Sequence, residues 1–455
     1  MLTILAFILT IGIVVTVHEY GHFQVARWCG VKVLKFSIGF GRPLWCKKFG
    51  KDQTEFVIAS IPLGGYVKML GEEHLTNTTH LNDQDFSRAL NRQSVGKRMA
   101  IVLAGPFANL LLAILLYWIL FMTGIVGIKP IIGKLVEHSP AAMQKLQAGE
   151  IIQTINQQKV TSWQDARWIF LKESLNNADV EVQTINPQNA IKTYHLNLSN
   201  INLEDEKQDV LEKVGFVVDM PAIPAQIGEV TMDSPAAMAG LKTNDLILEV
   251  NQVKVGSWEA FVQKVREHPQ MPITLLVERN GQPVTINVVP EAIEEKGTKI
   301  GRIGAGFNMP QSDLDKFFIT THYSFDNAFL KAVDKTWDTS IFSLKMLGNM
   351  LLGNVSWKGM SGPVTIASYA GQSVNMGIKA FVGFLALISI SIGVLNLLPI
   401  PILDGGHFMY YMIEFFTGHP VSEAVMNIGQ RIGVLILLFM MVLAFYNDVN
   451  RLITG

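Results

Sequence analysis

The stretch VVTVHEYGHFQVA occupies residues 14–26, inside an apolar run at the N-terminus. It contains the pattern His-Glu-x-x-His, which on a helix puts His18 and His22 about one turn apart on one face. Two imidazoles at this spacing can bind one zinc ion, and Glu19 beside them can take a proton from water at the metal. A charged side chain in a membrane helix costs about 2.5–3.5 kcal/mol on insertion scales, so the glutamate indicates a function.

The composition is that of a membrane protein with a sizeable soluble part: 49% of the residues are hydrophobic, 16% are charged, and the mean hydropathy is +0.29. Segments long enough to span a bilayer lie at 1–26, 99–126, 378–404 and 430–447. The first lacks a basic n-region and a small-residue cleavage site, so we expect a retained helix rather than a signal peptide.

The charge and the cysteine content argue against nucleic-acid binding and against cysteine-based structure or metal binding. The net charge of −1 gives no indication of nucleic-acid binding. Cys29 and Cys46 are the only cysteines and do not form a Cys-x-x-Cys pair, so neither a disulfide framework nor a thiolate zinc site is expected.

The loop at 27–98 sets the expected orientation. It carries 12 Lys plus Arg against 6 Asp plus Glu, which by the positive-inside rule makes it cytoplasmic. Both termini and the long segment 127–377 then lie outside. The loop after the third span has no Lys or Arg in 399–430, but the parity of four spans still assigns it to the cytoplasmic side.

Residues 131–163 and 226–258 match without a gap at an offset of 95 residues, including SPAAM in both copies. The runs are rich in β-formers, and an Asn-Gly turn at 280–281 indicates a hairpin. The copies resemble permuted PDZ domains, which implies two α+β domains at 127–200 and 209–292. PDZ domains bind peptide C-termini at a groove, and Gly215 and Phe216 resemble the carboxylate loop of the second copy. The alternative is that both copies are packing modules without a ligand.

A catalytic zinc site needs a third protein ligand and leaves a fourth position open. Residues 396–405, NLLPIPILDG, end the third span at the cytoplasmic side, which is the expected depth of His18 and His22. Asp404 is the natural carboxylate ligand there. His407 is the alternative ligand. It could instead donate a hydrogen bond to a metal ligand, or be an ordinary helix residue.

His-Glu-x-x-His in the first helix with Asn-x-x-Pro-x-Pro-x-x-Asp-Gly in a later one resembles the site-2 proteases, intramembrane zinc metalloproteases. The two PDZ-like copies resemble the bacterial RseP type, and the resemblance covers essentially the whole chain. It implies Zn²⁺ bound by His18, His22 and Asp404, Glu19 as general base, and Asn396 and Pro399 near the substrate. Residues 105–109, GPFAN, also fit this family, and Asn109 could form a hydrogen bond across helices.

The runs FSIGFG at 36–41 and TEFVIASIPLGGYVKM at 54–69 are β-like. They resemble the family's hairpin that dips into the membrane beside the active site, with Gly39, Phe40 and Gly41 as its Gly-x-Gly. An edge strand could hold an unwound substrate in extended form. The alternative is a plain cytoplasmic hairpin. Residues 293–377 are expected to be an amphipathic helical linker.

The expected protein is thus a bacterial inner-membrane metalloendopeptidase with four transmembrane helices, a membrane-associated β-hairpin and two extracytoplasmic PDZ domains. By resemblance, it cleaves single-span membrane substrates: an anti-sigma factor already trimmed outside, and remnant signal peptides. We expect the PDZ-like pair to act chiefly as a size filter. The alternatives are a non-enzymatic PDZ scaffold with a structural metal site, and a metal transporter.

Overall fold

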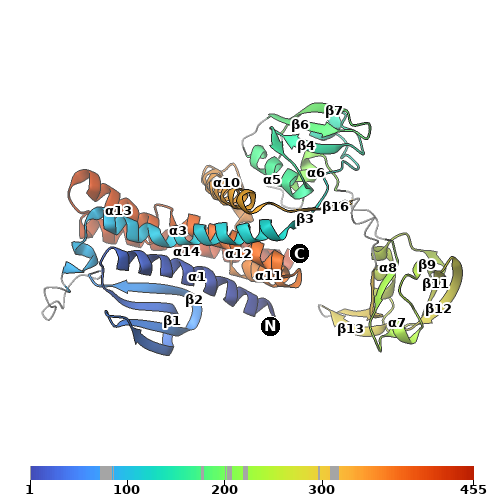
Figure 1. Cartoon of the computed structure of the whole chain (residues 1–455), viewed down its shortest axis with the longest axis horizontal. Helices are drawn as coiled ribbons and strands as arrows, with labels where there is room; N and C mark the ends of the chain where they lie inside the picture. The colour runs from blue at the N-terminus through green and yellow to red at the C-terminus, as the bar shows by residue number, and fades with distance from the viewer. Residues whose placement is uncertain are drawn as a thin grey trace. The chain divides into compact units, whose positions relative to one another are not determined.

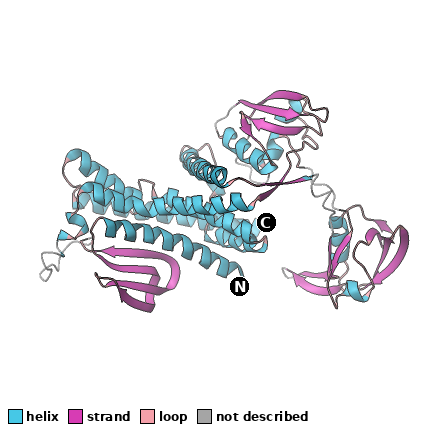
Figure 2. Ribbon diagram, viewed as in Figure 1, coloured by secondary structure: helices cyan, strands magenta, loops and turns pink. Residues whose placement is uncertain are grey.

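The computed structural model of the chain describes residues 2–71, 85, 87–175, 179–199, 201, 208–218, 224–295, 298–307 and 317–454. Contacts between residues divide it into two compact units. The first, here called the membrane unit, comprises Met1–Ile125, Asn202–Lys207 and Thr321–Gly455. The second, called the inserted unit, comprises Val126–Ile201 and Gln208–Thr320. Helices predominate in the membrane unit (Figure 1), and strands form most of the inserted unit (Figure 2).

Among the described residues, four helices are long and apolar enough to cross a bilayer, as predicted: α1 (Leu2–Trp28), α3 (Val95–Thr123), α12 (Ile378–Asn396) and α14 (Glu423–Thr454). The prediction that the third span runs to 404 is wrong, because α12 ends at Asn396. Pro399 and Pro401 follow, and proline lacks the backbone N–H that a helix needs and disfavours helix before it. The fourth helix begins at Glu423 instead of 430 and is longer than predicted.

Small residues allow α1 and α3 to approach closely. A Cβ on Gly21 of α1 would lie 2.4 Å from the carbonyl oxygen of Ala104 in α3, so no side chain fits there. Such close backbone packing is a main source of helix association in membranes. On another side of α3, α12 and α10 (Phe325–Leu351) pack through the buried residues Ala113, Ala328 and Ala386.

Helix α11 (Pro363–Asn375) is fixed to α14 by a buried carboxylate. Asp448 of α14 accepts hydrogen bonds from the backbone N–H groups of Gly362, Val364 and Thr365 at 2.8–3.2 Å. These amides belong to the unpaired donors that every helix N-terminus presents. The contact therefore satisfies the start of α11 and fastens one end of α14.

Strands β1 (Val33–Phe49) and β2 (Thr54–Met69) form an antiparallel hairpin with several bulges, which contains both predicted β runs. The first part of β1 pairs with both ends of β2: Phe36 lies opposite Phe56 and also opposite Val67. The sheet is therefore curled, and the end of β2 around Val67 forms one of its edges. That edge lies against α1, since a Cβ on Gly65 would be 3.2 Å from Val15.

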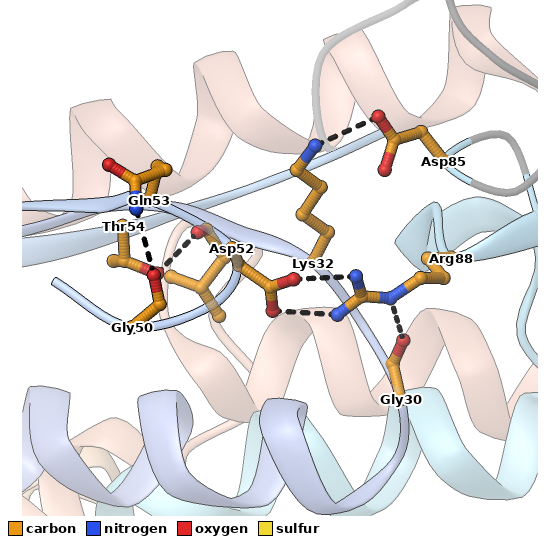
Figure 3. Close-up of polar contacts among 9 residues, drawn as sticks. Gly30, Lys32, Gly50, Asp52, Gln53, Thr54, Asp85 and Arg88 are labelled. Atoms are coloured by element: carbon orange, nitrogen blue, oxygen red, sulfur yellow. Dashed lines mark hydrogen bonds and ion pairs between the residues drawn. The ribbon is translucent and has the colours of Figure 1, made fainter. Parts of the chain in front are cut away.

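A polar network ties the hairpin turn to the helices (Figure 3). Arg88 donates hydrogen bonds of 2.6 and 2.7 Å to the Asp52 carboxylate and one of 3.2 Å to the Gly30 carbonyl, just past the end of α1. Lys32 pairs with Asp85 at 2.8 Å. The hydrogen bonds from Arg88 lower the pKa of Asp52. The network joins the hairpin, α1 and the segment that leads through η1 (Leu90–Arg92) to α3.

The inserted unit contains two modules that share one strand order, as the 95-residue repeat predicts. In the first the order is β5-β4-β6-β7, and in the second it is β10-β9-β11-β12. The first has β4 (Ile151–Ile155), β5 (Gln158–Lys159), β6 (Asp179–Ile185), β7 (Ile191–Asn197), α4 (Pro140–Met143), α5 (Trp163–Ser174) and α6 (Val210–Val214). The second has β8 (Ile227–Val230), β9 (Leu246–Val250), β10 (Val253–Lys254), β11 (Ile273–Arg279), β12 (Gln282–Val288), α7 (Pro235–Met238) and α8 (Trp258–Arg266).

The assignment of Gly215 and Phe216 to the second copy is wrong, because both residues complete the first module. Phe216 forms a bridge with Leu135, and its ring lies 5.4 Å from Trp163 and 5.6 Å from Phe170. The corresponding strand of the second module is β15 (Ala305–Phe307), which pairs with β8. Each module therefore extends beyond its predicted boundary: the first to the Leu135–Phe216 bridge beyond residue 200, and the second to β15 beyond residue 292.

Among the described residues of the segment expected to be a helical linker, 293–377, strands form most of the first part and long helices form the second. The segment begins with strands β13 (Glu291–Glu295), β14 (Thr298–Arg302) and β15, and β16 (Phe318–Thr321) pairs with β3 (Ile125–Ile128). Helices α10 and α11 follow, with η2 (Trp357–Gly359) between them. Residues 308–316 of this segment lie outside the described residues, as do 72–84 of the predicted cytoplasmic loop.

Candidate metal centre

His18 and His22 lie one turn apart on α1, on the face that packs against α3. Both are buried, with 8% of each residue exposed. Gly105 of α3 makes room for them, because a Cβ there would lie 2.2 Å from His22 Nε2 and 2.8 Å from His18 Nε2. The two Nε2 atoms are 3.2 Å apart.

Asp404 reaches the two histidines from a different helix. It is the first residue of α13 (Asp404–Thr417), which follows the Pro399–Pro401 loop at the end of α12. The chain turns back so tightly that a Cβ on Gly405 would lie 2.3 Å from the Leu398 carbonyl oxygen, and one on Gly406 would lie 2.2 Å from that of Ile400. The Asp-Gly-Gly sequence is what permits this turn.

The three side chains fit three corners of a tetrahedral zinc site. Asp404 Oδ2 lies 3.0 Å from His18 Nε2 and 3.4 Å from His22 Nε2. Ligands bound to zinc at ~2.0–2.1 Å with tetrahedral angles lie roughly 3.3 Å from one another. Asp404 Oδ2 is also buried without a hydrogen-bond partner among the described residues, as expected of an oxygen that binds a metal ion. The donor set of two imidazoles and a carboxylate is one that zinc accepts.

The Nδ1 atoms of both histidines, which are not the candidate metal-binding atoms, contact polar groups of α3. His22 Nδ1 lies 2.8 Å from the Ile101 carbonyl oxygen, and His18 Nδ1 lies 3.2 Å from the side-chain amide of Asn109. Metal-bound histidines usually have a partner on the second ring nitrogen, which fixes the orientation of the ring. Sequence reasoning noted that Asn109 could bond across helices but did not connect it with His18.

Glu19 follows His18 on α1 and lies beside the hairpin. A Cβ on Gly65 of β2 would be 2.9 Å from Glu19 Cγ and 2.8 Å from the Ser37 carbonyl oxygen. The backbone of the edge strand therefore lies directly against the side chain predicted to be the general base.

The remaining predicted site residues lie on the neighbouring segments. Gly39 and Gly41 have φ of +89° and +92°, and Phe40 between them stacks on Tyr66 at 6.2 Å. Asn396 is the last residue of α12, and Pro399 follows in the loop to Asp404. His407, the rival ligand, is not in the cluster of ligand atoms that His18, His22 and Asp404 form, all within 4.8 Å of one another among the described residues.

Comparisons with known proteins agree with this chemistry. The sequence profile of peptidase family M50 matches residues 6–440. The Regulator of sigma-E protease RseP of Escherichia coli (strain K12) is 37% identical, with 98% of each chain covered. A putative zinc metalloprotease of Neisseria meningitidis is 39% identical, with 99% of each chain covered. A PDZ domain of Listeria monocytogenes matches 24% of this chain, and all of its own, with 22% identity and a TM-score of 0.16, which is too low to support an argument.

Proposed function

The chain belongs to peptidase family M50 and is an intramembrane zinc metalloprotease, and we propose that His18, His22 and Asp404 bind its zinc ion while Glu19 acts as general base. The proposal rests on one observation: the candidate ligand atoms of His18, His22 and Asp404 all lie within 4.8 Å of one another. Glu19 directly follows His18 on α1. A purely structural metal site needs no base, so Glu19 favours the protease over the scaffold.

Zinc, when bound, supplies a Lewis acid that lowers the pKa of water and polarises a carbonyl group. Glu19 accepts one proton from the attacking water, whose oxygen bonds to the carbonyl carbon of the scissile peptide. The C–N bond then breaks, and Glu19 delivers the proton to the departing amine nitrogen. The products are a carboxylic acid, which releases its remaining proton to solvent and becomes a carboxylate, and an amine; Glu19 is regenerated as the carboxylate.

The substrate must be extended when it is cut, because the carbonyl groups of a helix are engaged in i→i−4 hydrogen bonds. Among the described residues, β2 pairs with β1 alone, so its edge at Gly65, beside Glu19, is open to a further strand. We infer that a substrate segment adds to this edge by β-augmentation and so runs past the base. Gly39, Phe40 and Gly41 in the adjoining strand, and Asn396 and Pro399 before Asp404, are proposed to contact the same segment.

The substrate class follows from the location of the site on apolar helices. We propose that it is a single-span membrane protein. Because the Escherichia coli relative is named a regulator of sigma-E protease, an anti-sigma factor trimmed outside the membrane is the proposed partner, and remnant signal peptides are a second class. The proposed location is the bacterial inner membrane, with the hairpin loop cytoplasmic and both termini and the inserted unit periplasmic. Binding of peptide C-termini at the modules is part of this proposal.

The test is to co-express the full chain with a single-span protein that carries one tag on each side of its span. The expected product is cut within the span, at a bond that mass spectrometry of the fragments identifies. The matched control is Glu19→Gln, which keeps all three ligands and should yield no fragment. The same amount of the same fragment from Glu19→Gln cells would contradict the proposal that the cut is made with Glu19 as general base.

A further inference from the structure

Asn109 lies on α3 and is fully buried, with 0% of the residue exposed. One end of its side-chain amide is 3.2 Å from His18 Nδ1. The other end, assigned as Oδ1, has no hydrogen-bond partner among the described residues. A buried amide left partly unpaired costs about 1–3 kcal/mol, so a residue held in this state requires a reason.

The chemistry of His18 supplies that reason. A neutral imidazole carries one N–H, and metal binding through Nε2 requires that this proton be on Nδ1. Nδ1–H needs an acceptor. Among the described residues, the group at hydrogen-bond distance from it is the Asn109 amide, of which the oxygen can accept. The nitrogen and oxygen of an amide are assigned from their hydrogen bonds, because their positions alone do not distinguish them. The amide oxygen of Asn109 therefore faces His18 when the metal is bound.

We propose that Asn109 is a positioning residue for the metal centre: its amide oxygen accepts the His18 Nδ1–H and thereby keeps Nε2 free to bind zinc. The inference rests on the proposed function, since it takes His18 as a zinc ligand. His22 provides the internal comparison. Its Nδ1 faces the Ile101 carbonyl oxygen at 2.8 Å, and a carbonyl can only accept.

The spacing along α3 explains how one helix serves both rings. Ile101, Gly105 and Asn109 are four residues apart and therefore lie along one face. Ile101 presents its carbonyl to His22, Gly105 leaves space for both imidazoles, and Asn109 presents its amide to His18. A sequence pattern of a small residue followed four positions later by an asparagine thus has a role in holding the metal ligands.

The backbone of Asn109 is fixed independently of its side chain. Ser389 of α12 donates a hydrogen bond of 2.7 Å from Oγ to the main-chain carbonyl oxygen of Asn109. Ser389→Ala removes this contact but leaves the amide facing His18. It is a matched control for a general loosening of the packing between α3 and α12.

The experiment measures zinc retention by the purified full-length protein in detergent, titrated with a competing chelator. Asn109→Leu and the smaller Asn109→Ala remove the acceptor, and Asn109→Asp keeps it. We expect both apolar variants to bind zinc roughly 10–100-fold more weakly, as for other outer-sphere partners of metal-bound histidines. Asn109→Asp and Ser389→Ala should retain zinc nearly as the unaltered protein does.

Each other outcome overturns the inference. Normal zinc retention in Asn109→Ala would show that His18 needs no acceptor. Equal weakening in Asn109→Asp, which keeps the size of the side chain and the acceptor, would show that the acceptor is not what holds His18. Equal weakening in Ser389→Ala would assign the effect to packing between α3 and α12. Failure of the proposed function is distinguishable, because the unaltered protein would then retain zinc no better than a His18→Ala variant.

Discussion

Arg98, in the first turn of α3, and Glu414, near the end of α13, form a bidentate ion pair with N–O distances of 2.6 and 3.0 Å. Both side chains are largely buried, at 13% and 14% exposed. The guanidinium also lies 4.9 Å from the centre of the Tyr411 ring, a cation–π contact. Because α13 begins at Asp404, this pair holds the helix that carries the proposed third ligand against the helix that faces the histidines.

Removing either partner should weaken metal binding. Arg98→Met or Glu414→Gln leaves one buried charge unpaired, which costs about 3–5 kcal/mol and loosens the docking of α13 on α3. We expect zinc retention against a chelator to fall by about tenfold or more, and the exchanged pair Arg98→Glu with Glu414→Arg to recover part of the loss. If the exchanged pair does not recover zinc retention, the bidentate hydrogen bonds or the Tyr411 contact, rather than the opposite charges, hold α13 against α3.

The choice between Asp404 and His407 as third ligand can be made by substitution. Asp404→Asn replaces the charged oxygen that lies 3.0 Å from His18 Nε2, so both zinc and activity should be lost. His407→Ala should retain zinc, since this residue lies outside the ligand cluster. Metal analysis of the purified variants is the measurement, and the opposite pattern would move the ligand to His407.

Glu19→Gln separates chemistry from metal binding. The amide has the shape of the carboxylate but cannot accept the proton, and the ligands are untouched. Peptide cleavage should fall by at least about 10²-fold, the lower end of what general bases contribute, while zinc content stays at the unaltered level. Near-normal turnover by a zinc-loaded Glu19→Gln protein would remove this residue from the mechanism.

Gly65 should be required for turnover without being required for zinc. In Gly65→Ala the new Cβ would approach Glu19 Cγ to 2.9 Å and the Ser37 carbonyl oxygen to 2.8 Å, so the edge strand or the base must shift. We expect a lower kcat with unchanged zinc content. The matched control is Gly12→Ala on α1, where the new Cβ meets nothing within 4 Å. Equal effects of the two substitutions on kcat would show that the contact between the edge strand and Glu19 does not influence turnover.

Local sequence patterns predicted the elements that depend on neighbouring residues alone, such as the first helix and the other apolar spans. The His-Glu-x-x-His spacing and the apolar runs indicated α1 and the number of spans. The end of α12 at Asn396 also has a local signal, Pro399 and Pro401, but the loop that contains these prolines is itself apolar, so apolar content alone extends the span past the end of the helix. The loop turns back and places Asp404 Oδ2 beside the two histidines, and the role of Asp404 as a zinc ligand stays a prediction.

The predictions that depended on pairing between distant residues were the less accurate ones. Gly215 and Phe216 precede the second copy in the chain, and their position suggested that they open it, yet they close the first module against Leu135. A repeat offset aligns equivalent residues but does not say which strand pairs with which copy. The Arg98–Glu414 pair had no signal at all, since its members are 316 residues apart and neither belongs to a motif.

The size-filter hypothesis can be tested by excising the inserted unit. The chain leaves and re-enters the membrane unit at adjacent points, because Tyr323 N–H donates a hydrogen bond of 3.3 Å to the Phe121 carbonyl oxygen. A short Gly/Ser linker can therefore replace 126–320 without straining α3 or α10. The proposed zinc ligands and base all lie in the membrane unit, so the excised protein should retain zinc and cut trimmed substrate.

If the inserted unit excludes substrates by their bulk, the full chain should not cut untrimmed substrate, whereas the excised protein should. The comparison variant must fill a groove without unfolding its module. Gly215→Trp is unsuitable, because a Cβ there would lie 2.0 Å from Ser139 Oγ. Gly306 lines a cavity of about 510 Å³ between α8 and β15, and a Cβ on it has only ordinary contacts at 3.8 Å and beyond. Gly306→Trp should leave cleavage of both substrates as in the full chain. Refusal of untrimmed substrate by the excised protein would contradict the filter, and loss of trimmed-substrate cleavage in Gly306→Trp would favour peptide recognition at this groove.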